Sequence, residues 1–157
     1  MSEPISQAEL EAYAALKQAI ASIRLNLGKH LQGLGGISLV QFEILFLLEQ
    51  AQEGLRMHEI AEAIGHSRSG LTYQITQMEE QGWVQRSSGL SNARAVIATL
   101  TPAGMARVRE LQDEHFAFVR RRAFGLLSEE ELGVMTSILR RISSGSTSSE
   151  NGPGSTR

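Results

Sequence analysis

The chain has 157 residues and no cysteine, and 41% of its residues are hydrophobic, 20% charged and 5% aromatic. This composition excludes collagen-like, wholly disordered and disulfide-stapled proteins, and the length suits one domain or two tightly joined small lobes. Fifteen Lys and Arg against seventeen Asp and Glu give a formal charge of -2. A balance this close to neutral argues against indiscriminate coating of nucleic acid, so any contact with DNA has to be local.

The sequence carries no sign of membrane insertion, export or catalysis. No apolar run approaches the roughly 20 residues that span a bilayer, and the N-terminus lacks the pattern of a signal peptide, so we expect a cytoplasmic protein. The four histidines are dispersed and no cysteine joins them, which argues against a metal site. No nucleophile with a positioned base and no phosphate-binding loop is recognisable, so we expect neither an enzymatic reaction nor a cofactor.

The first fifty residues predict two helices of different character. Apolar residues spaced by three or four over 6–31 predict a long amphipathic helix, which the glycines of 33–36 should end. Ser38 is a suitable N-cap for the second helix. Its residues 39–48 are apolar nearly all round, so we expect this helix to be central.

The middle of the chain predicts two helices that meet at a tight turn, followed by a hairpin. A short helix over 57–64 ends at Gly65, and Ser67 caps a helix that reaches about Gln81. Residues 83–87 and 94–100 then read as two strands of a small hairpin. This order of elements is that of a winged helix-turn-helix, a DNA-binding arrangement.

The C-terminal third predicts two more helices and a tail. Thr101 and Pro102 supply a cap and an N1 proline for a long helix through Phe124. Ser128 and Glu131 form a capping box for the last helix, which should extend to about residue 143. The remaining residues are rich in Ser, Gly and Thr and predict disorder.

Together these elements predict a mainly α fold with a small β-hairpin wing: a winged helix-turn-helix lobe plus a helical dimerisation region. The flanking helices carry more apolar surface than so small a lobe can cover, which predicts a second copy of the chain. Two recognition helices would then reach major grooves roughly 34 Å apart on a pseudo-palindrome. An intramolecular bundle is the alternative. The predicted parts are an N-terminal dimerisation helix at 6–37, the DNA-binding lobe at 38–101, C-terminal dimerisation helices at 102–143 and a disordered tail at 144–157.

The second helix of the helix-turn-helix carries the candidate recognition surface. At 100° per residue, Leu71, Ile75 and Met78 share one side, which leaves a polar, uncharged face outward. Hydroxyls and amides on such a face can read base edges in the major groove, and a merely solvated face is the alternative. The candidate DNA-binding residues, those of the wing included, are Ser67, Arg68, Ser69, Thr72, Tyr73, Thr76, Gln77, Arg86, Asn92 and Arg94.

Three arginines are placed to bind the DNA backbone. Arg68 lies beside the helix cap, where its guanidinium and free backbone N–H groups can meet one phosphate. Arg86 and Arg94 are expected near the hairpin tip, where Arg can enter the minor groove or clamp the backbone. Either could instead be a surface charge. The net charge of +1 over 66–94 is weak for a DNA-binding surface, although a dimer would double it.

The segment 55–65, Leu-Arg-Met-His-Glu-Ile-Ala-Glu-Ala-Ile-Gly, resembles the first helix-turn-helix element of the MarR (multiple antibiotic resistance regulator) family. Residues 71–86, ending Met-Glu-Glu-Gln-Gly-Trp-Val-Gln-Arg, are similar to that family's recognition helix and first wing strand. Asn92-Ala93-Arg94, followed by a strand that leads to Leu100, Thr101 and Gly104, resembles its wing motif.

The resemblance covers about residues 8–142, and it departs from the family pattern at two places. Asn92 stands where the wing usually carries Asp, and Tyr73-Gln74 stands where many members carry an Arg. Both departures concern operator sequence and affinity rather than the fold.

The resemblance implies a homodimer built from both chain ends that binds an operator in double-stranded DNA, most simply as a ligand-responsive repressor. It also implies a crevice between dimer and DNA lobes that takes small aromatic acids or similar effectors. The candidate effector residues are His30, Phe42, Phe46 and His115, and for the two Phe residues core packing is the alternative. A different reading, favoured by the low local charge, is an effector-binding or protein-interaction module that keeps the fold but has lost DNA binding.

Overall fold

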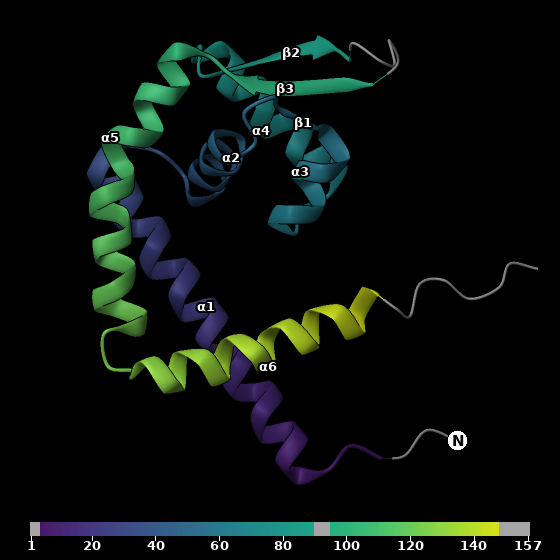
Figure 1. The fold of residues 1–157 in the computed structure, drawn as a ribbon, viewed down its shortest axis with the longest axis vertical. Coiled ribbons are helices and arrows are strands. Elements are labelled where there is room, and N and C mark those ends of the chain that lie inside the picture. The colour runs from purple at the N-terminus through teal and green to yellow at the C-terminus, as the bar shows by residue number, and fades with distance from the viewer. Residues whose placement is uncertain (1–3, 90–94, 148–157) are drawn as a thin grey trace, which may run out of the picture. The chain divides into compact units, whose positions relative to one another are not determined.

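The computed structural model describes residues 4–89 and 95–147 and confirms a mainly helical fold with a small antiparallel sheet (Figure 1). The chain divides into two compact units at the boundary between Val119 and Arg120, and each is described by itself. The first unit contains α1 (Gln7–Gly35), α2 (Leu39–Gln50), β1 (Leu55–Arg56), α3 (Met57–Ile64), α4 (Arg68–Glu80), β2 (Val84–Ser88), β3 (Val96–Leu100) and α5 (Pro102–Val119). The second contains the π-helix η1 (Arg120–Phe124) and α6 (Glu129–Thr147).

Capping boxes start the first two helices. Ser6 Oγ accepts a hydrogen bond from the Glu9 N–H at 3.2 Å, and the Glu9 carboxylate accepts from the Ser6 N–H at 2.7 Å. Ser38 and Gln41 exchange the equivalent pair of bonds, both at 3.1 Å. Each box satisfies two backbone donors that a helix N-terminus otherwise leaves unpaired, which is why both helices begin where the sequence predicts.

The first helix ends within the glycine segment 33–36, as predicted, although only one of these glycines ends it. α1 continues through Gly33 and Gly35 and stops only at Gly36, which takes a left-handed conformation with φ of 65°. A Cβ on Gly35 would lie 2.5 Å from Arg107 Nη2 and 2.9 Å from Leu111 Cδ2. The glycine at position 35 therefore lets α5 approach α1 closely rather than breaking the helix.

α2 lies at the centre of the first unit, as its nearly continuous apolar sequence predicts. It contacts α1, α3, α4, α5 and β3. The helix-turn-helix shares this core through residues of α3 and α4. The buried residues of these three helices are Leu39, Phe42, Ile44, Leu45, Leu48, Ile60, Ala61, Leu71, Ile75 and Met78.

The sheet has three strands in the order β1-β3-β2, all antiparallel, where the sequence predicts a hairpin of two. β1 pairs Leu55 with Ala98, and a strand of two residues has no alternation by which a sequence could reveal it. Gly54 precedes it with φ of 82°, and a Cβ there would lie 2.5 Å from the Ala98 carbonyl oxygen. The long pairing is β2 with β3, from Val84 opposite Leu100 to Ser88 opposite Val96.

Thr101 joins the base of the wing to α5. Its hydroxyl donates to the Gly82 carbonyl at 2.6 Å and accepts from the Gly104 N–H at 3.1 Å, while its own N–H donates to the Trp83 carbonyl at 3.0 Å. A Cβ on Gly104 would lie 2.0 Å from the Trp83 carbonyl oxygen. Thr101 and Gly104 therefore hold the start of α5 directly against Trp83, the residue before β2.

The end of α5 and the last helix differ from the prediction. The α-helix stops at Val119, and the next five residues form a π-helix whose wide turn is closed by the Gly125 N–H bonding the Arg120 carbonyl at 2.6 Å. The predicted capping box of Ser128 and Glu131 is confirmed. α6 continues to Thr147, so the first four residues of the predicted disordered tail are helical, and 148–157 lie outside the described residues.

Within the part of the chain that the structure describes, no single helix is long and apolar enough to cross a membrane. Among the described helices, α1 and α2 reach that length and composition when they are taken together, but they are bent by 82° at their junction.

Candidate nucleic-acid interface

α4 presents a polar face opposite a buried one. Ser67 caps the helix by accepting from the Gly70 N–H at 3.2 Å. The side chains that the helical spacing predicts to be internal, Leu71, Ile75 and Met78, are completely buried. On the opposite side the side chain of Tyr73 is 63% exposed. Ser69 and Thr72 are also exposed, whereas Thr76 and Gln77 are half-buried.

Several polar side chains of α4 already hold partners within the helix. The Thr72 hydroxyl donates to the Arg68 carbonyl and the Thr76 hydroxyl to the Thr72 carbonyl, both at 2.9 Å. Gln77 Nε2 donates to Glu80 Oε2 at 3.2 Å. A base edge that approaches Gln77 would therefore compete with a carboxylate for one of its amide protons.

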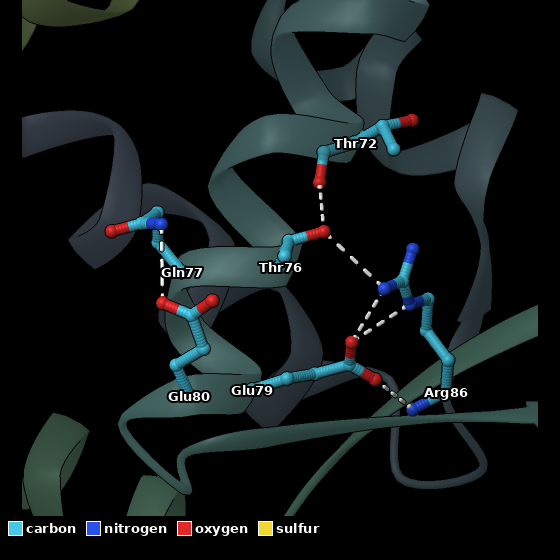
Figure 2. A network of polar contacts seen from close by, with 6 residues as sticks. All are labelled: Thr72, Thr76, Gln77, Glu79, Glu80 and Arg86. Atoms are coloured by element: carbon cyan, nitrogen blue, oxygen red, sulfur yellow. Dashed lines mark hydrogen bonds and ion pairs between the residues drawn. The ribbon is translucent and has the colours of Figure 1, made fainter.

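Arg86 lies in the middle of β2, with its guanidinium turned toward α4 (Figure 2). Its Nε and Nη2 donate to Glu79 Oε2 at 2.9 and 2.6 Å, and its backbone N–H donates to Glu79 Oε1 at 2.9 Å. Nη2 also lies 3.3 Å from Thr76 Oγ1. The guanidinium holds the pKa of the Glu79 carboxyl below its usual value, chiefly through these side-chain hydrogen bonds. DNA contact by Arg86 stays a prediction, and its charge is already paired.

A hollow of about 470 Å³ opens between the start of α3, the start of α4 and the start of β3. Two of its lining residues are Arg56 and Arg68, and neither has an ion pair among the described residues. Two unpaired guanidinium groups on one concave surface suit a phosphate. The lining residues are Arg56, Met57, His58, Arg68, Leu71, Thr72, Ala95 and Val96.

The hollow adds residues that sequence reasoning missed. Arg56 is the last residue of β1 and the N-cap of α3, and His58 lies in the first turn of α3, where no spacing rule singles them out. The only available signal was that this segment starts beside the recognition helix. The predicted wing residues Asn92 and Arg94 lie outside the described residues, and their contacts with DNA stay predictions.

The four candidate effector residues come together in the first unit, between α1, α2 and α5. The rings of Phe42 and His115 lie 4.2 Å apart between centroids, those of Phe42 and Phe46 6.2 Å, and those of His30 and His115 6.3 Å. Two further residues of α5 join them: Phe118 stacks on His30 at 3.9 Å and Phe116 meets Phe46 edge to face at 5.1 Å. We call these six residues the aromatic-histidine cluster.

Both histidines of the cluster bury a nitrogen without a partner. His30 Nε2 and His115 Nδ1 are inaccessible and hold no hydrogen bond in the structure. Burial, together with the charge of His30, lowers the pKa of His115 to about 4, so this imidazole is neutral at pH 7. A buried polar atom without a partner is costly, and a ligand or water that supplied one would be stabilised there. Across the described ranges, no group of three or more metal-ligating side chains is present.

Comparison with known proteins gives one consistent result. The sequence model of the MarR family matches residues 37–96, from the segment between α1 and α2 to the first residue of β3. The chain is 23% identical over 138 residues to the HTH-type transcriptional regulator MhqR of Bacillus subtilis, covering 88% of this chain and 93% of that protein.

Two solved structures share the fold over almost the whole chain. Sco3205, a MarR family transcriptional regulator from Streptomyces coelicolor crystallised in complex with DNA, superposes with a TM-score of 0.84 and 26% identity, covering 92% of this chain and 91% of that one. AbsC, a MarR family transcriptional regulator from the same organism, gives a TM-score of 0.84 and 29% identity, with coverage of 94% and 99%. The sequence pattern of the MarR family, over 37–96, and the fold of MarR family regulators, over almost the whole chain, therefore occur in the same molecule.

Proposed function

We propose that this chain is a sequence-specific regulator of transcription that binds double-stranded DNA, acting in the cytoplasm as a ligand-responsive repressor. Its activity is binding and not catalysis. The observation that carries the proposal is the exposed polar face of α4 beside Arg56 and Arg68, which form no ion pair with another described residue. It occurs in a fold that, over 92% of this chain, is similar to a regulator crystallised in complex with DNA.

The proposed contacts are of two kinds: contacts to base edges, which recognise the DNA sequence, and contacts to the DNA backbone, which position the protein. Ser69, Thr72 and Tyr73 project from α4 and would meet base edges in the major groove, together with the half-buried Thr76 and Gln77. Ser67 and the guanidiniums of Arg56 and Arg68 would hold phosphates. Asn92 and Arg94 of the wing would meet the flanking backbone or minor groove.

We propose a homodimer as the acting form, because both ends of the chain expose apolar side chains. On α1, Tyr13 is 58% and Ile20 50% exposed, and on α6, Val134 is 56% and Ile142 50% exposed. Apolar side chains repeated along a helix favour a partner that covers them. A second copy of the chain supplies one and places two α4 helices on a pseudo-palindromic operator.

The effector site that we propose is the aromatic-histidine cluster. It joins α1, α2 and α5, and it contains two buried nitrogens without partners. Its rings would stack on a small aromatic ligand, and the ligand's hydroxyl or carboxyl group would bond His30 Nε2 or His115 Nδ1.

The test is fluorescence anisotropy with duplex DNA from the chain's own upstream region, over a series of salt concentrations. Wild-type protein should bind with strong salt dependence. Arg94→Ala should weaken binding to every sequence and reduce the salt slope by about 0.9 per lost phosphate contact, whereas Gln77→Ala should change base preference and keep the slope. Absence of salt-dependent binding would contradict the function, and equal effects of both variants on all sequences would contradict the assigned roles.

A further inference from the structure

We propose that Arg86 is a positioning residue that ties the wing to the recognition helix, and that it does not bind DNA. This inference rests on the proposed function. It starts from the network of Figure 2, in which one guanidinium on β2 holds a carboxylate and a hydroxyl on α4.

The register of the sheet points Arg86 toward the protein. In an antiparallel pair, residues directly opposite share a face of the sheet, and every second residue of a strand does too. Arg86 is opposite Ala98 and two residues from Val84, and both of these side chains are buried. Arg86 therefore lies on the face that packs on the core, whereas Gln85 and Ser87 lie on the other face.

The partners of Arg86 on α4 form a continuous chain of hydrogen bonds. Glu79 accepts both from the side chain and from the backbone N–H of Arg86, so the carboxylate fixes strand and guanidinium together. Thr76 Oγ1 accepts from Arg86 Nη2 and donates to the Thr72 carbonyl. Thr72 lines the hollow beside Arg68, so the chain of bonds leads from the wing to the proposed DNA-contact surface.

The same contacts explain why the guanidinium is a poor phosphate ligand. Its side chain is 31% exposed and that of Glu79 28%, so the pair is partly shielded from solvent. A phosphate would have to displace a carboxylate held by two charge-assisted bonds, and it would then face the freed negative charge of Glu79. The wing and α4 are instead held in one orientation before DNA binds, which lowers the entropy lost on binding.

Two substitutions that change the charge in opposite directions distinguish a positioning role of Arg86 from a phosphate contact. Arg86→Gln removes a positive charge and Glu79→Gln removes a negative one, so a phosphate contact predicts opposite effects on affinity. The positioning role predicts that each weakens binding to the upstream DNA by about threefold to tenfold, that the double variant is no weaker than either single one, and that all keep the wild-type salt slope. Glu62→Gln, an exposed residue of α3, is the charge-matched control and should not weaken binding.

Two binding results would overturn the inference. One is a salt slope reduced by about 0.9 in Arg86→Gln with tighter binding in Glu79→Gln, which would make Arg86 a phosphate ligand. The other is unchanged binding in both variants, which would leave the pair without a role in DNA recognition.

A second measurement separates this inference from the proposed function. A double-variant cycle in urea unfolding should show that the two substitutions are coupled, and exchange of charge in Glu79→Arg with Arg86→Glu should restore part of the lost stability. If the wild-type protein binds no DNA, the proposed function fails. The cycle then still decides whether the pair joins β2 to α4, and additive effects on stability would overturn that link.

Discussion

His115 should make the stability of the protein depend on pH in a way that one substitution removes. The side chain is 4% exposed, and burial, aided by the charge of His30, lowers its pKa to about 4 from an ordinary 6.5. The folded protein keeps this imidazole neutral, whereas the unfolded chain takes up a proton below pH 6.5. The stability is therefore fully present above about pH 6.5 and is lost as the pH falls toward 4.

The magnitude follows from the two pKa values. Between pH 7 and pH 5, protonation of His115 in the unfolded chain should lower the free energy of unfolding by about 1.8 kcal/mol. The whole difference between the two pKa values corresponds to about 3 kcal/mol. This is a large share of the 5 to 15 kcal/mol typical of a domain. It should be visible as a fall in the urea midpoint at pH 5.

The assay is urea unfolding at one fixed protein concentration at pH 7, 6 and 5. His115→Phe keeps an aromatic ring and removes the titrating group. Its free energy of unfolding should therefore fall by about 1.8 kcal/mol less than that of wild type between pH 7 and pH 5. His58→Gln removes an exposed histidine and should follow wild type. Parallel pH profiles for wild type and His115→Phe would refute the reasoning. If His115→Phe does not fold, NMR titration of the His115 ring in wild type decides instead, and a midpoint near 6.5 would contradict it.

Three other substitutions test other parts of the structure. Arg56→Ala should weaken binding to all DNA sequences and lower the salt slope by about 0.9, measured by anisotropy, and an unchanged slope would remove this arginine from the contact surface. Gly104→Ala should cost about 2 kcal/mol or more in urea unfolding, because its Cβ would lie 2.0 Å from the Trp83 carbonyl. Gly28→Ala, which meets nothing within 4 Å inside α1, is its control and should not destabilise. Ile138→Glu should shift the sedimentation coefficient toward that of a single chain, and an unchanged value would place the dimer contact away from this face of α6.

The elements that the sequence predicts correctly are those whose causes are local. A capping box is made by residues three apart, so Ser38 and Ser128 reveal the starts of their helices without knowledge of the rest of the fold. The sequence places the end of α1 among the glycines of 33–36 but does not single out Gly36. Gly36 ends the helix in a left-handed conformation, whereas Gly35 serves a contact with α5, which is formed by a segment about seventy residues away.

The sequence predicts the orientation of a site side chain where helical spacing determines it. It does not do so where the orientation depends on the pairing of distant segments. The spacing of Leu71, Ile75 and Met78 is enough to define the outward face of α4. For Arg86 the sequence predicts a strand, but only its register with β3 decides that the side chain turns inward to Glu79. That the histidines of α1 and α5 meet came from the family resemblance and not from the residues themselves, since nothing in their spacing relates two distant helices.

α5 connects the aromatic-histidine cluster to the base of the wing. Gly104 rests on the backbone before β2, and His115 lies eleven residues further along the same uninterrupted helix, a distance of about 16 Å. A helix of this length moves as a rigid body. A ligand bound within the aromatic-histidine cluster would therefore tilt α5 rather than bend it. A tilt of about 5° would carry the other end, and the root of the wing with it, through about 1.4 Å, enough to pull an arginine out of hydrogen-bonding range of a phosphate.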